Sequence, residues 1–352
     1  MKVPQVSLKA WKDLYEIALR YRDLKPWDLL ADEELFGVQD PITRQIGYCC
    51  VIGTLGEILG LCIYRGSEGL AFYESLRSGE RIPEEEYDVV GMQNALLADF
   101  TDRRDLEKED LSIIKALNLK IRGRKQYPLF RSYLPGYIPW FLTEDEAYFL
   151  TFALHCACDL FKVYKENPMI LESAEEDYYL VYKPQRKNTE TLKWTKEWLK
   201  PEPLAKPVIP KIILNELQLQ KIKKMNLIQD TPWEADFFFM PSMVIKDKDR
   251  PYLGSIVMVA HQDSGFIFFV NVIPDNAEPH IELMEGILSV IEKHKILPSE
   301  IRFRNRIAAE VVKPMADNLG FKITLAKDLR AIDEARTSLS KEAQMGFPNF
   351  PR

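Results

Sequence analysis

The chain has 352 residues, of which 46% are hydrophobic and 28% are charged, so it is long enough for two or three domains with ordinary packed cores. The formal net charge of −6 argues against a protein whose whole surface binds phosphate, although a local basic patch is compatible with it. No apolar run approaches the roughly 20 residues that span a bilayer, and the N-terminus lacks the apolar core of a signal peptide. We therefore expect a cytoplasmic protein without membrane contact.

The N-terminal region, residues 1–199, has the mixed pattern of an α+β domain. Helical periodicity marks residues 7–22, 70–78, 106–117 and 143–165. Apolar runs typical of strands mark residues 47–54, 58–64, 93–100, 178–183 and 192–198. Residues 35–41 carry turn chemistry and predict a loop. The polar, acidic stretch around residues 80–90 is a candidate break between two subdomains.

The cysteines are interpreted as core residues. They are Cys49, Cys50, Cys62, Cys156 and Cys158. An odd number in a long chain does not indicate a disulfide framework. His155 precedes the last two, but residues at i and i+2 of a helix point to different faces, so the spacing favours core packing over a metal site.

Residues 122–141 have the most unusual local composition in the chain. Arg122, Arg124, Lys125 and Arg131 alternate with aromatic residues that include Trp140, and no acid lies among them. Guanidinium groups hold phosphate or carboxylate and aromatic rings stack on bases, so the segment is a candidate surface for an anionic ligand or nucleic acid. The alternative is a rigid, proline-braced loop whose aromatic side chains cover a sheet and whose arginines pair with nearby acids.

A linker and a second domain follow. Four prolines, Pro201, Pro203, Pro207 and Pro210, predict a semi-rigid linker over residues 200–212. Residues 213–342 then form an α/β domain, and residues 343–352 form a tail that is either disordered or docked by its two phenylalanines.

The α/β domain shows a characteristic order of elements. Strands are predicted at 235–244, 252–260, 266–273, 301–304 and 321–325, and helices at 279–294, 308–319 and 328–341. With Trp233-x-x-Asp236 at the first strand and Asp263-Ser264-Gly265 in the turn of the following hairpin, this order resembles the ribonuclease H-like fold of retroviral-type integrases and transposases. The resemblance implies a mixed sheet with flanking helices.

The resemblance also implies three carboxylates that hold two divalent ions, Mg²⁺ or Mn²⁺, roughly 3.5–4 Å apart. Asp236 matches the first carboxylate. The position of the second, after the fourth strand, falls on Asn305, which has Arg304 and Arg306 on either side. An amide binds Mg²⁺ weakly and guanidinium groups repel it, so the sequence favours a degenerate core without a metal cofactor.

Other acids stand in for a missing ligand in the alternative hypothesis. Asp333 is a candidate for the last acid, with Asp328 and Glu334 as neighbours that no motif separates from it, and Asp263 is a candidate for a displaced acid. The N-terminal region resembles bacterial domains of unknown function, through Pro26-Trp27 and the glycine and proline turns near residues 64–69 and 135–139, and no activity comes with that resemblance.

Three functions remain open on the sequence. The first is a non-catalytic binding or regulatory protein, with the basic and aromatic segment and the arginines near Asn305 as binding residues. The second is a metal-dependent nuclease or strand-transfer enzyme that uses Asp236. The third is a protein-interaction scaffold, such as a homodimer formed along an edge strand. Three carboxylates converging at one cleft would favour the second, and an arginine-lined cleft with one acid would favour the first.

Overall fold

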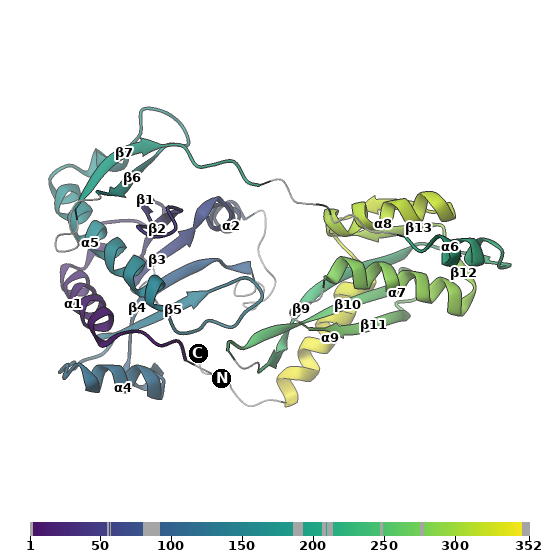
Figure 1. The fold of residues 1–352 in the computed structure, drawn as a ribbon, viewed down its shortest axis with the longest axis horizontal. Coiled ribbons are helices and arrows are strands. Elements are labelled where there is room, and N and C mark those ends of the chain that lie inside the picture. Colours follow the sequence, from purple (N-terminus) through teal and green to yellow (C-terminus); the bar gives the residue numbers. More distant parts are fainter. Residues whose placement is uncertain are drawn as a thin grey trace. The chain divides into compact units, whose positions relative to one another are not determined.

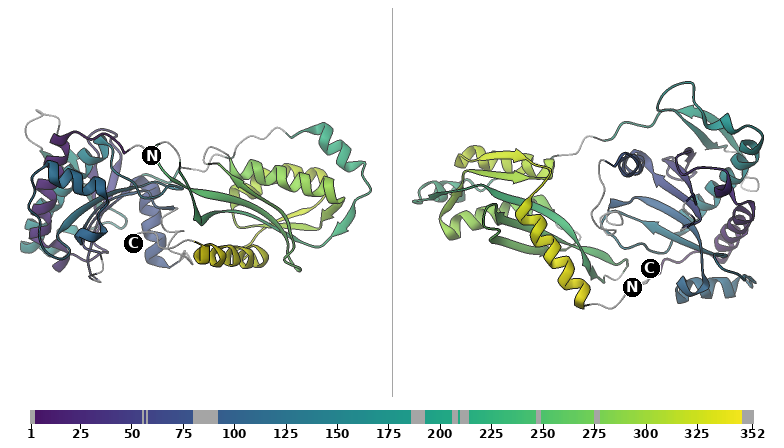
Figure 2. Two further views of the ribbon diagram at one scale, coloured as in Figure 1. Left: turned by 90° about the horizontal axis from the view of Figure 1, so that it is seen from below. Right: turned by 180° about the vertical axis from the view of Figure 1, so that it is seen from behind.

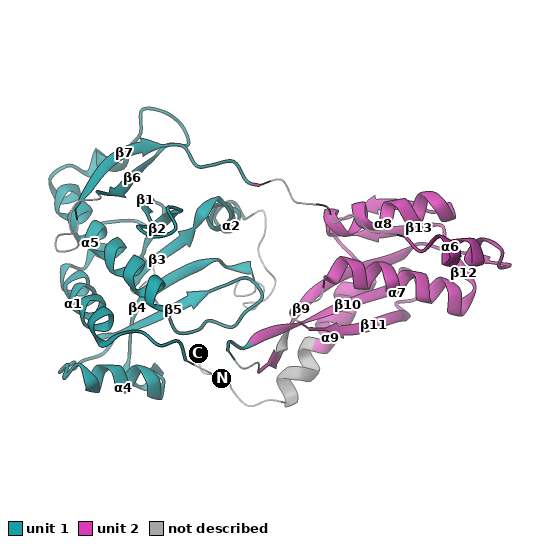
Figure 3. Ribbon diagram, in the orientation of Figure 1, with its two compact units in different colours: residues 1–204, 247–251, 351–352 teal, residues 205–246, 252–350 magenta. Residues whose placement is uncertain are grey.

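The structure, a computed structural model, describes residues 3–54, 56, 58–79, 92–185, 193–205, 209, 214–246, 249–274 and 278–346. It divides into two compact units (Figure 3). Unit 1 comprises residues 1–204, 247–251 and 351–352, and unit 2 comprises residues 205–246 and 252–350. Most of the predicted linker beyond residue 205 and the tail from residue 347 onward lie outside the described residues.

Unit 1 is built on a seven-stranded sheet (Figure 1). In spatial order its strands are β5 (Tyr127–Tyr133), β4 (Ala95–Thr101), β3 (Gly60–Arg65), β2 (Ile46–Ile52), β1 (Phe36–Gln39), β6 (Tyr179–Pro184) and β7 (Trp194–Leu199). Neighbours are antiparallel except β1 and β6, which are parallel. Strands β3 and β4, on either side of residues 80–91, pair directly, so this region forms one sheet instead of the two subdomains allowed by the sequence.

Helices cover both faces of this sheet. They are α1 (Leu8–Leu24), α2 (Gly66–Ser78), α4 (Lys108–Ala116) and α5 (Glu144–Glu166). Strand β2 explains the arrangement, because its side chains alternate between two cores. Cys49 and Val51 join the core formed with α1 and α5, whereas Tyr48 and Cys50 join the core that includes Leu70 of α2.

Strand β1 corrects the prediction of a loop at residues 35–41. Phe36 and Val38 are fully buried, and the strand pairs with β2 on one side and β6 on the other. A Cβ added at Gly37 would lie 2.7 Å from Cγ2 of Val181, so the glycine that reads as a turn residue is required by close packing instead. Four residues are too few to show the alternation of a strand.

Strand β5 corrects the prediction of a loop at the basic and aromatic segment. Residues Tyr127–Tyr133 form the edge strand beside β4, and Phe130 points into the core. Pro128, which suggests a loop in the sequence, is tolerated because an edge strand has one side without a ladder partner.

Unit 2 contains a five-stranded sheet. In spatial order its strands are β11 (Ile267–Ile273), β10 (Tyr252–His261), β9 (Trp233–Ile245), β13 (Glu300–Phe303) and β14 (Lys322–Leu325). The first three are antiparallel, and β13 is parallel to both β9 and β14. A separate pair of short parallel strands, β8 (Ile228–Asp230) and β12 (Ile296–Pro298), was not expected from the sequence.

Helices lie on both faces of the unit 2 sheet. They are α6 (Glu216–Lys223), α7 (Pro279–His294), α8 (Arg306–Leu319) and α9 (Arg330–Gly346). Helices α7 and α8 share one core with Trp233, and α9 packs on the opposite face against Phe238 (Figure 2). Three antiparallel strands, with two parallel strands added beside the first, form the ribonuclease H-like topology, as the sequence predicts. Helix α9 extends to Gly346, beyond its predicted end.

Among the described residues, no helix has the length and apolar character needed to cross a bilayer.

Candidate functional site

One face of strand β9 buries two acids. Side chains alternate along a strand. Trp233 and Ala235 pack into the core beneath α7 and α8, so Glu234, Asp236 and Phe238 project towards α9. Glu234 is 2% exposed and Asp236 is 4% exposed, and a carboxylate at that depth requires partners.

Arg304 is the partner of Asp236. Its Nη1 donates to Oδ2 of Asp236 at 2.9 Å, and its Nη2 donates to both carboxylate oxygens of Asp333, at 2.6 and 2.9 Å. Its Nε donates to the carbonyl oxygen of Lys327 at 3.0 Å. Arg304 directly follows strand β13, and Asp333 lies in the first turn of α9. The fold thus brings together two of the predicted acids and places a guanidinium between them.

The residue that lies beside the acids at the end of strand β13 is Arg304, and not Asn305 as the sequence predicted. Asn305 does not face the two acids as the expected counterpart of the second carboxylate: it is the N-cap of α8, and its Oδ1 accepts from the backbone N–H of Ala308 at 3.0 Å. Arg304, one residue earlier, lies at the strand end beside Asp236. Arg306 is the first residue of α8 and is exposed. The position therefore carries a positive charge instead of a neutral amide.

Burial and neighbouring charges shift the pKa values of Asp236 and Arg304. Burial raises the pKa of Asp236 to about 6, and the neighbouring Arg304 lowers it without cancelling that effect. Burial alone would lower the pKa of Arg304, but its hydrogen bonds to Asp333 and the charges of both acids raise it above its ordinary value. The guanidinium therefore stays charged throughout the physiological pH range.

Glu234 has a structural role that the sequence does not reveal. Its Oε2 accepts from the backbone N–H groups of Ala331 at 2.8 Å and Ile332 at 3.2 Å, at the N-terminus of α9. Those N–H groups have no partner within the helix, and a carboxylate also favours the positive end of the helix dipole. The contact joins residues almost a hundred positions apart, so no local motif announces it.

In unit 1, Arg131 is held by acids of its own unit. Its Nη1 and Nη2 donate to the two carboxylate oxygens of Asp110 at 3.0 and 2.8 Å, and Nη2 also donates to Glu107 at 3.1 Å. The guanidinium packs over the ring of Phe141, 4.6 Å from its centroid. At 7% exposure Arg131 is part of the core, and its charge is paired with acids of its own unit.

The other cations of the segment differ in exposure. Arg122 and Arg124 are exposed, and Arg124 makes a long ion pair with Asp102, 3.9 Å between Nε and Oδ2. Lys125 is half-buried, its Nζ donates to the carbonyl oxygen of Gly56, and its backbone N–H donates to Asp102. The segment is therefore a turn that precedes an edge strand, with two arginines in solvent.

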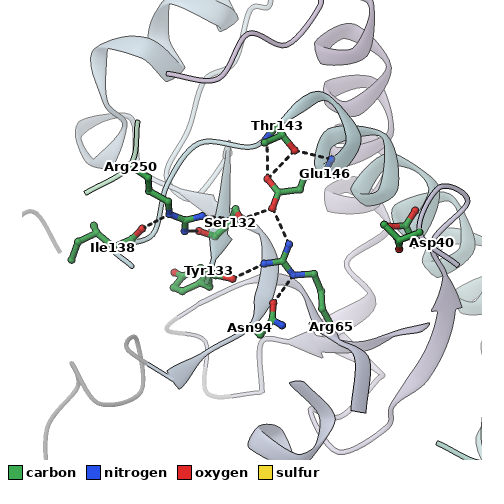
Figure 4. A network of polar contacts seen from close by, with 10 residues as sticks. Asp40, Arg65, Asn94, Ser132, Tyr133, Ile138, Thr143, Glu146 and Arg250 are labelled. Carbon is green, nitrogen blue, oxygen red and sulfur yellow. Dashed lines mark hydrogen bonds and ion pairs between the residues drawn. The ribbon is translucent and has the colours of Figure 1, made fainter. Parts of the chain in front are cut away.

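A polar network surrounds Glu146, the capping-box residue of α5 (Figure 4). Its Oε1 accepts from Nη1 of Arg65 at 2.8 Å and from Oγ of Ser132 at 2.6 Å. Its Oε2 accepts from the backbone N–H of Thr143 at 2.9 Å and from its Oγ1 at 3.2 Å. The capping box is predicted by the sequence, whereas the role of Arg65 in this network is not.

A pocket of about 380 Å³ opens beside this network. Trp140, one of the predicted binding residues, lines it together with Glu146 and Arg250. Arg250 belongs to unit 1, and Figure 4 shows its side chain reaching Ser132 and Ile138. In the sequence Arg250 lies in a charged hairpin loop, and no local pattern singles it out.

The five cysteines are free and buried. Cys156 and Cys158 lie on the buried side of α5, and His155 is half-buried beside them. Burial raises the pKa of each thiol, to about 12 for Cys62 and about 11 for Cys158. Thiols of this kind are unreactive core residues.

Two family models match the chain. One, a domain of unknown function (DUF7309), covers residues 11–182, and the other, a domain of unknown function (DUF6930), covers residues 218–340. Each half of the chain thus matches a domain of unknown function. None of the curated proteins compared with the chain matches it.

Two solved structures of integrase cores are similar to part of the chain. The catalytic core domain of BIV integrase is 16% identical, over 34% of this chain and 74% of that chain, with a TM-score of 0.23. The HTLV-2 integrase catalytic core domain in complex with magnesium (dimeric form) is 16% identical, over 34% of this chain and 77% of that chain, with a TM-score of 0.22. The assignment of the ribonuclease H-like fold rests on the strand order of unit 2.

The donors around Asp236 do not fit a pair of divalent cations. Both Asp236 and Asp333 already bind the guanidinium of Arg304, whose charge would repel a metal ion. Asp263, the candidate for a displaced acid, is exposed in the turn between β10 and β11. Within the described part of the chain, no three His, Cys, Asp or Glu side chains gather in a way that could hold a metal.

Proposed function

We propose that the chain is a non-catalytic binding or regulatory protein whose unit 2 keeps the ribonuclease H-like fold without its metal-dependent chemistry. One observation carries the proposal: Arg304 lies between Asp236 and Asp333, at the strand end where the integrase-like enzymes have a carboxylate. The cluster then serves to hold β9, β13 and α9 together.

The physical argument concerns charge. Two-metal catalysis needs several carboxylates that are free to neutralise the ions. Here Nη2 of Arg304 contacts both oxygens of Asp333 and Nη1 contacts one oxygen of Asp236, so one guanidinium pairs with both carboxylates. A metal ion would have to displace this cation and would leave it without its acidic partners.

The test is isothermal titration of Mn²⁺ into the full chain and into three variants. We expect no site-specific binding to the wild type or to Asp236→Ala. Arg304→Asp places a third carboxylate beside the other two and removes the repelling charge, so we expect it to bind Mn²⁺ with measurable heat. Arg306→Asp makes the same change two residues away at an exposed position and should not create a site.

Saturable Mn²⁺ binding by the wild type that disappears in Asp236→Ala would contradict the proposal and support the metal-dependent nuclease. Circular dichroism of each variant shows whether it is folded. A folded Arg304→Asp variant that binds no Mn²⁺ would show that Arg304 is not what keeps metal out of this cluster.

A further inference from the structure

We infer that unit 1 binds a small organic carboxylate with an apolar body in the pocket beside Trp140. The inference rests on the binding role proposed above, and it gives that role a site and a class of ligand. It concerns residues of unit 1 alone, whereas the Mn²⁺ titration concerns unit 2, so the two can fail separately.

The size and walls of the pocket suit a small molecule. Its volume of about 380 Å³ lies within the range of roughly 300–1,000 Å³ common for ligand sites. Leu134, Phe141 and Trp140 come from the chain between the end of β5 and the start of α5, and Val3 and Pro4 come from the segment before α1. These side chains provide an apolar surface for the body of a ligand.

The indole of Trp140 supplies an unused donor. Its Nε1 is buried, and it has no hydrogen-bond partner among the described residues. A buried N–H group without an acceptor costs on the order of 1–3 kcal/mol. Trp140 lines the pocket, so a small shift of its indole would let an acceptor atom on a ligand satisfy this N–H group.

Arg250 supplies further donors and a positive charge. Its Nε donates to the carbonyl oxygen of Ile138 at 3.1 Å, its Nη1 donates to Oγ of Ser132 at 3.4 Å, and its Nη2 donates to the carbonyl oxygen of Ser132. A guanidinium has five N–H groups, so two have no acceptor among these contacts.

The charge of Arg250 is only partly balanced. None of the described carboxylates lies within the 4.0 Å of an ion pair with it. Burial lowers its pKa to about 10, so it is still charged at neutral pH and an anion would stabilise it. Asp249, which also lines the pocket, is exposed to solvent and does not form this pair.

The neighbouring acid does not compete for this role. Both oxygens of Glu146 already accept hydrogen bonds, from Arg65 and Ser132 on one side and from Thr143 on the other. Trp140 and Arg250, which line the pocket, therefore both carry unused donors. Donors beside a half-buried cation select an anionic acceptor, and the apolar walls select a ligand with an apolar body.

The test follows the indole N–H signals of the ¹⁵N-labelled full chain by NMR, with phenylacetate as the probe. The chain has six tryptophans, and Trp140→Phe identifies the signal of Trp140 by its loss. We expect phenylacetate to shift this signal saturably. Benzyl alcohol, which lacks the charge, and benzylammonium, which reverses it, should shift it much less.

Affinity is measured by calorimetry with the same probe. Trp140→Phe keeps the apolar wall but removes the donor, so we expect phenylacetate binding to weaken about fivefold, the effect of one hydrogen bond of about 1 kcal/mol. Trp198→Phe is the matched control, because Trp198 lies on β7, is 38% exposed and is not part of the pocket. Arg250→Gln tests the charge and should abolish measurable binding.

Three results would overturn the inference. They are an unshifted Trp140 signal at saturating phenylacetate, an equal response to benzylammonium, and unchanged affinity in Trp140→Phe. The remaining indole signals of each variant show whether it is folded. If Arg250→Gln is not folded, the affinity of Trp140→Phe decides the test.

Discussion

Two buried or partly buried guanidinium groups organise the charges of this protein at the scale of single residues. Arg131 lies between Asp110 and Glu107 in unit 1, and Arg304 lies between Asp236 and Asp333 in unit 2. Arg131 matches Asp110 with two parallel hydrogen bonds, from Nη1 and Nη2, whereas Arg304 contacts both oxygens of Asp333 through Nη2 alone. Both arginines are predicted as binding residues from the sequence, and both have acidic partners from their own unit.

The first prediction concerns Arg131. Arg131→Met leaves Asp110, which is 5% exposed, as an uncompensated buried charge, so we expect the free energy of unfolding to fall by about 3–5 kcal/mol. The measurement is urea unfolding. The double variant Arg131→Met/Asp110→Leu should recover much of the loss, and Arg124→Met, at an exposed position, should change stability by less than about 1 kcal/mol. Equal effects of the changes at 131 and 124 would contradict the buried pair.

The second prediction concerns Asp99 of strand β4. Burial raises its pKa to about 6, above the value of about 3.9 for an unfolded chain. The folded state therefore holds the proton more tightly, and its contribution to the free energy of unfolding is full below pH 4 and is lost as the pH rises through about 6. Asp99→Asn should show a smaller decline than the wild type in the urea unfolding of unit 1 between pH 4 and 7, whereas Asp236 keeps its own contribution in unit 2. Asp13→Asn, on the exposed side of α1, should keep the full decline.

At the scale of elements, helix α9 depends on a contact made by a strand. Glu234 of β9 accepts the first free N–H groups of α9, and Leu329, Ala331 and Ile332 pack into the core on that face. The helix carries Asp333 to Arg304, so its placement also fixes the geometry of the charged cluster.

The third prediction tests this cap. Glu234→Ala removes both hydrogen bonds to the helix N-terminus, and we expect the free energy of unfolding of unit 2 to fall by about 1–2 kcal/mol. Glu334→Ala removes an acid from the same helix that makes only an exposed pair with Arg330, so its effect should stay near about 0.5 kcal/mol. Hydrogen exchange of the backbone amides of α9 measures the effect of each of the two variants on the helix. Similar protection in the two variants would show that Glu234 does not anchor the helix.

At the scale of the whole molecule, the cysteine thiols are unevenly divided between the two units. All five cysteines lie in unit 1 and are buried, whereas unit 2 has none among its residues. Since burial raises the pKa of every thiol, the thiolate fraction at pH 8 is small and access is blocked.

The fourth prediction follows from this division. Ellman's reagent at pH 8 should react with none of the thiols of the folded chain and with all five in denaturant. Their exposure as denaturant is added should report the unfolding of unit 1. Rapid reaction of any thiol under native conditions would show that it is not in the core described for it.

Periodicity determined most of the elements from the sequence alone. The hydrophobic face of α7 and the runs of β9 and β10 are long enough to show their repeats, so the order of elements in residues 213–342 predicted the ribonuclease H-like fold. Strands β1 and β5 escaped prediction because the first is short and the second contains a proline that only an edge position explains.

The candidate sites were decided by tertiary structure. The sequence alone showed that arginines flank Asn305, but not that Arg304 is the residue between the two carboxylates. Its partners are 68 and 29 positions away, and Arg250 meets Ser132 across 118 positions. Local patterns record the spacing of side chains along one element, whereas hydrogen bonds and charge pairs between elements depend on which strands and helices the fold places side by side.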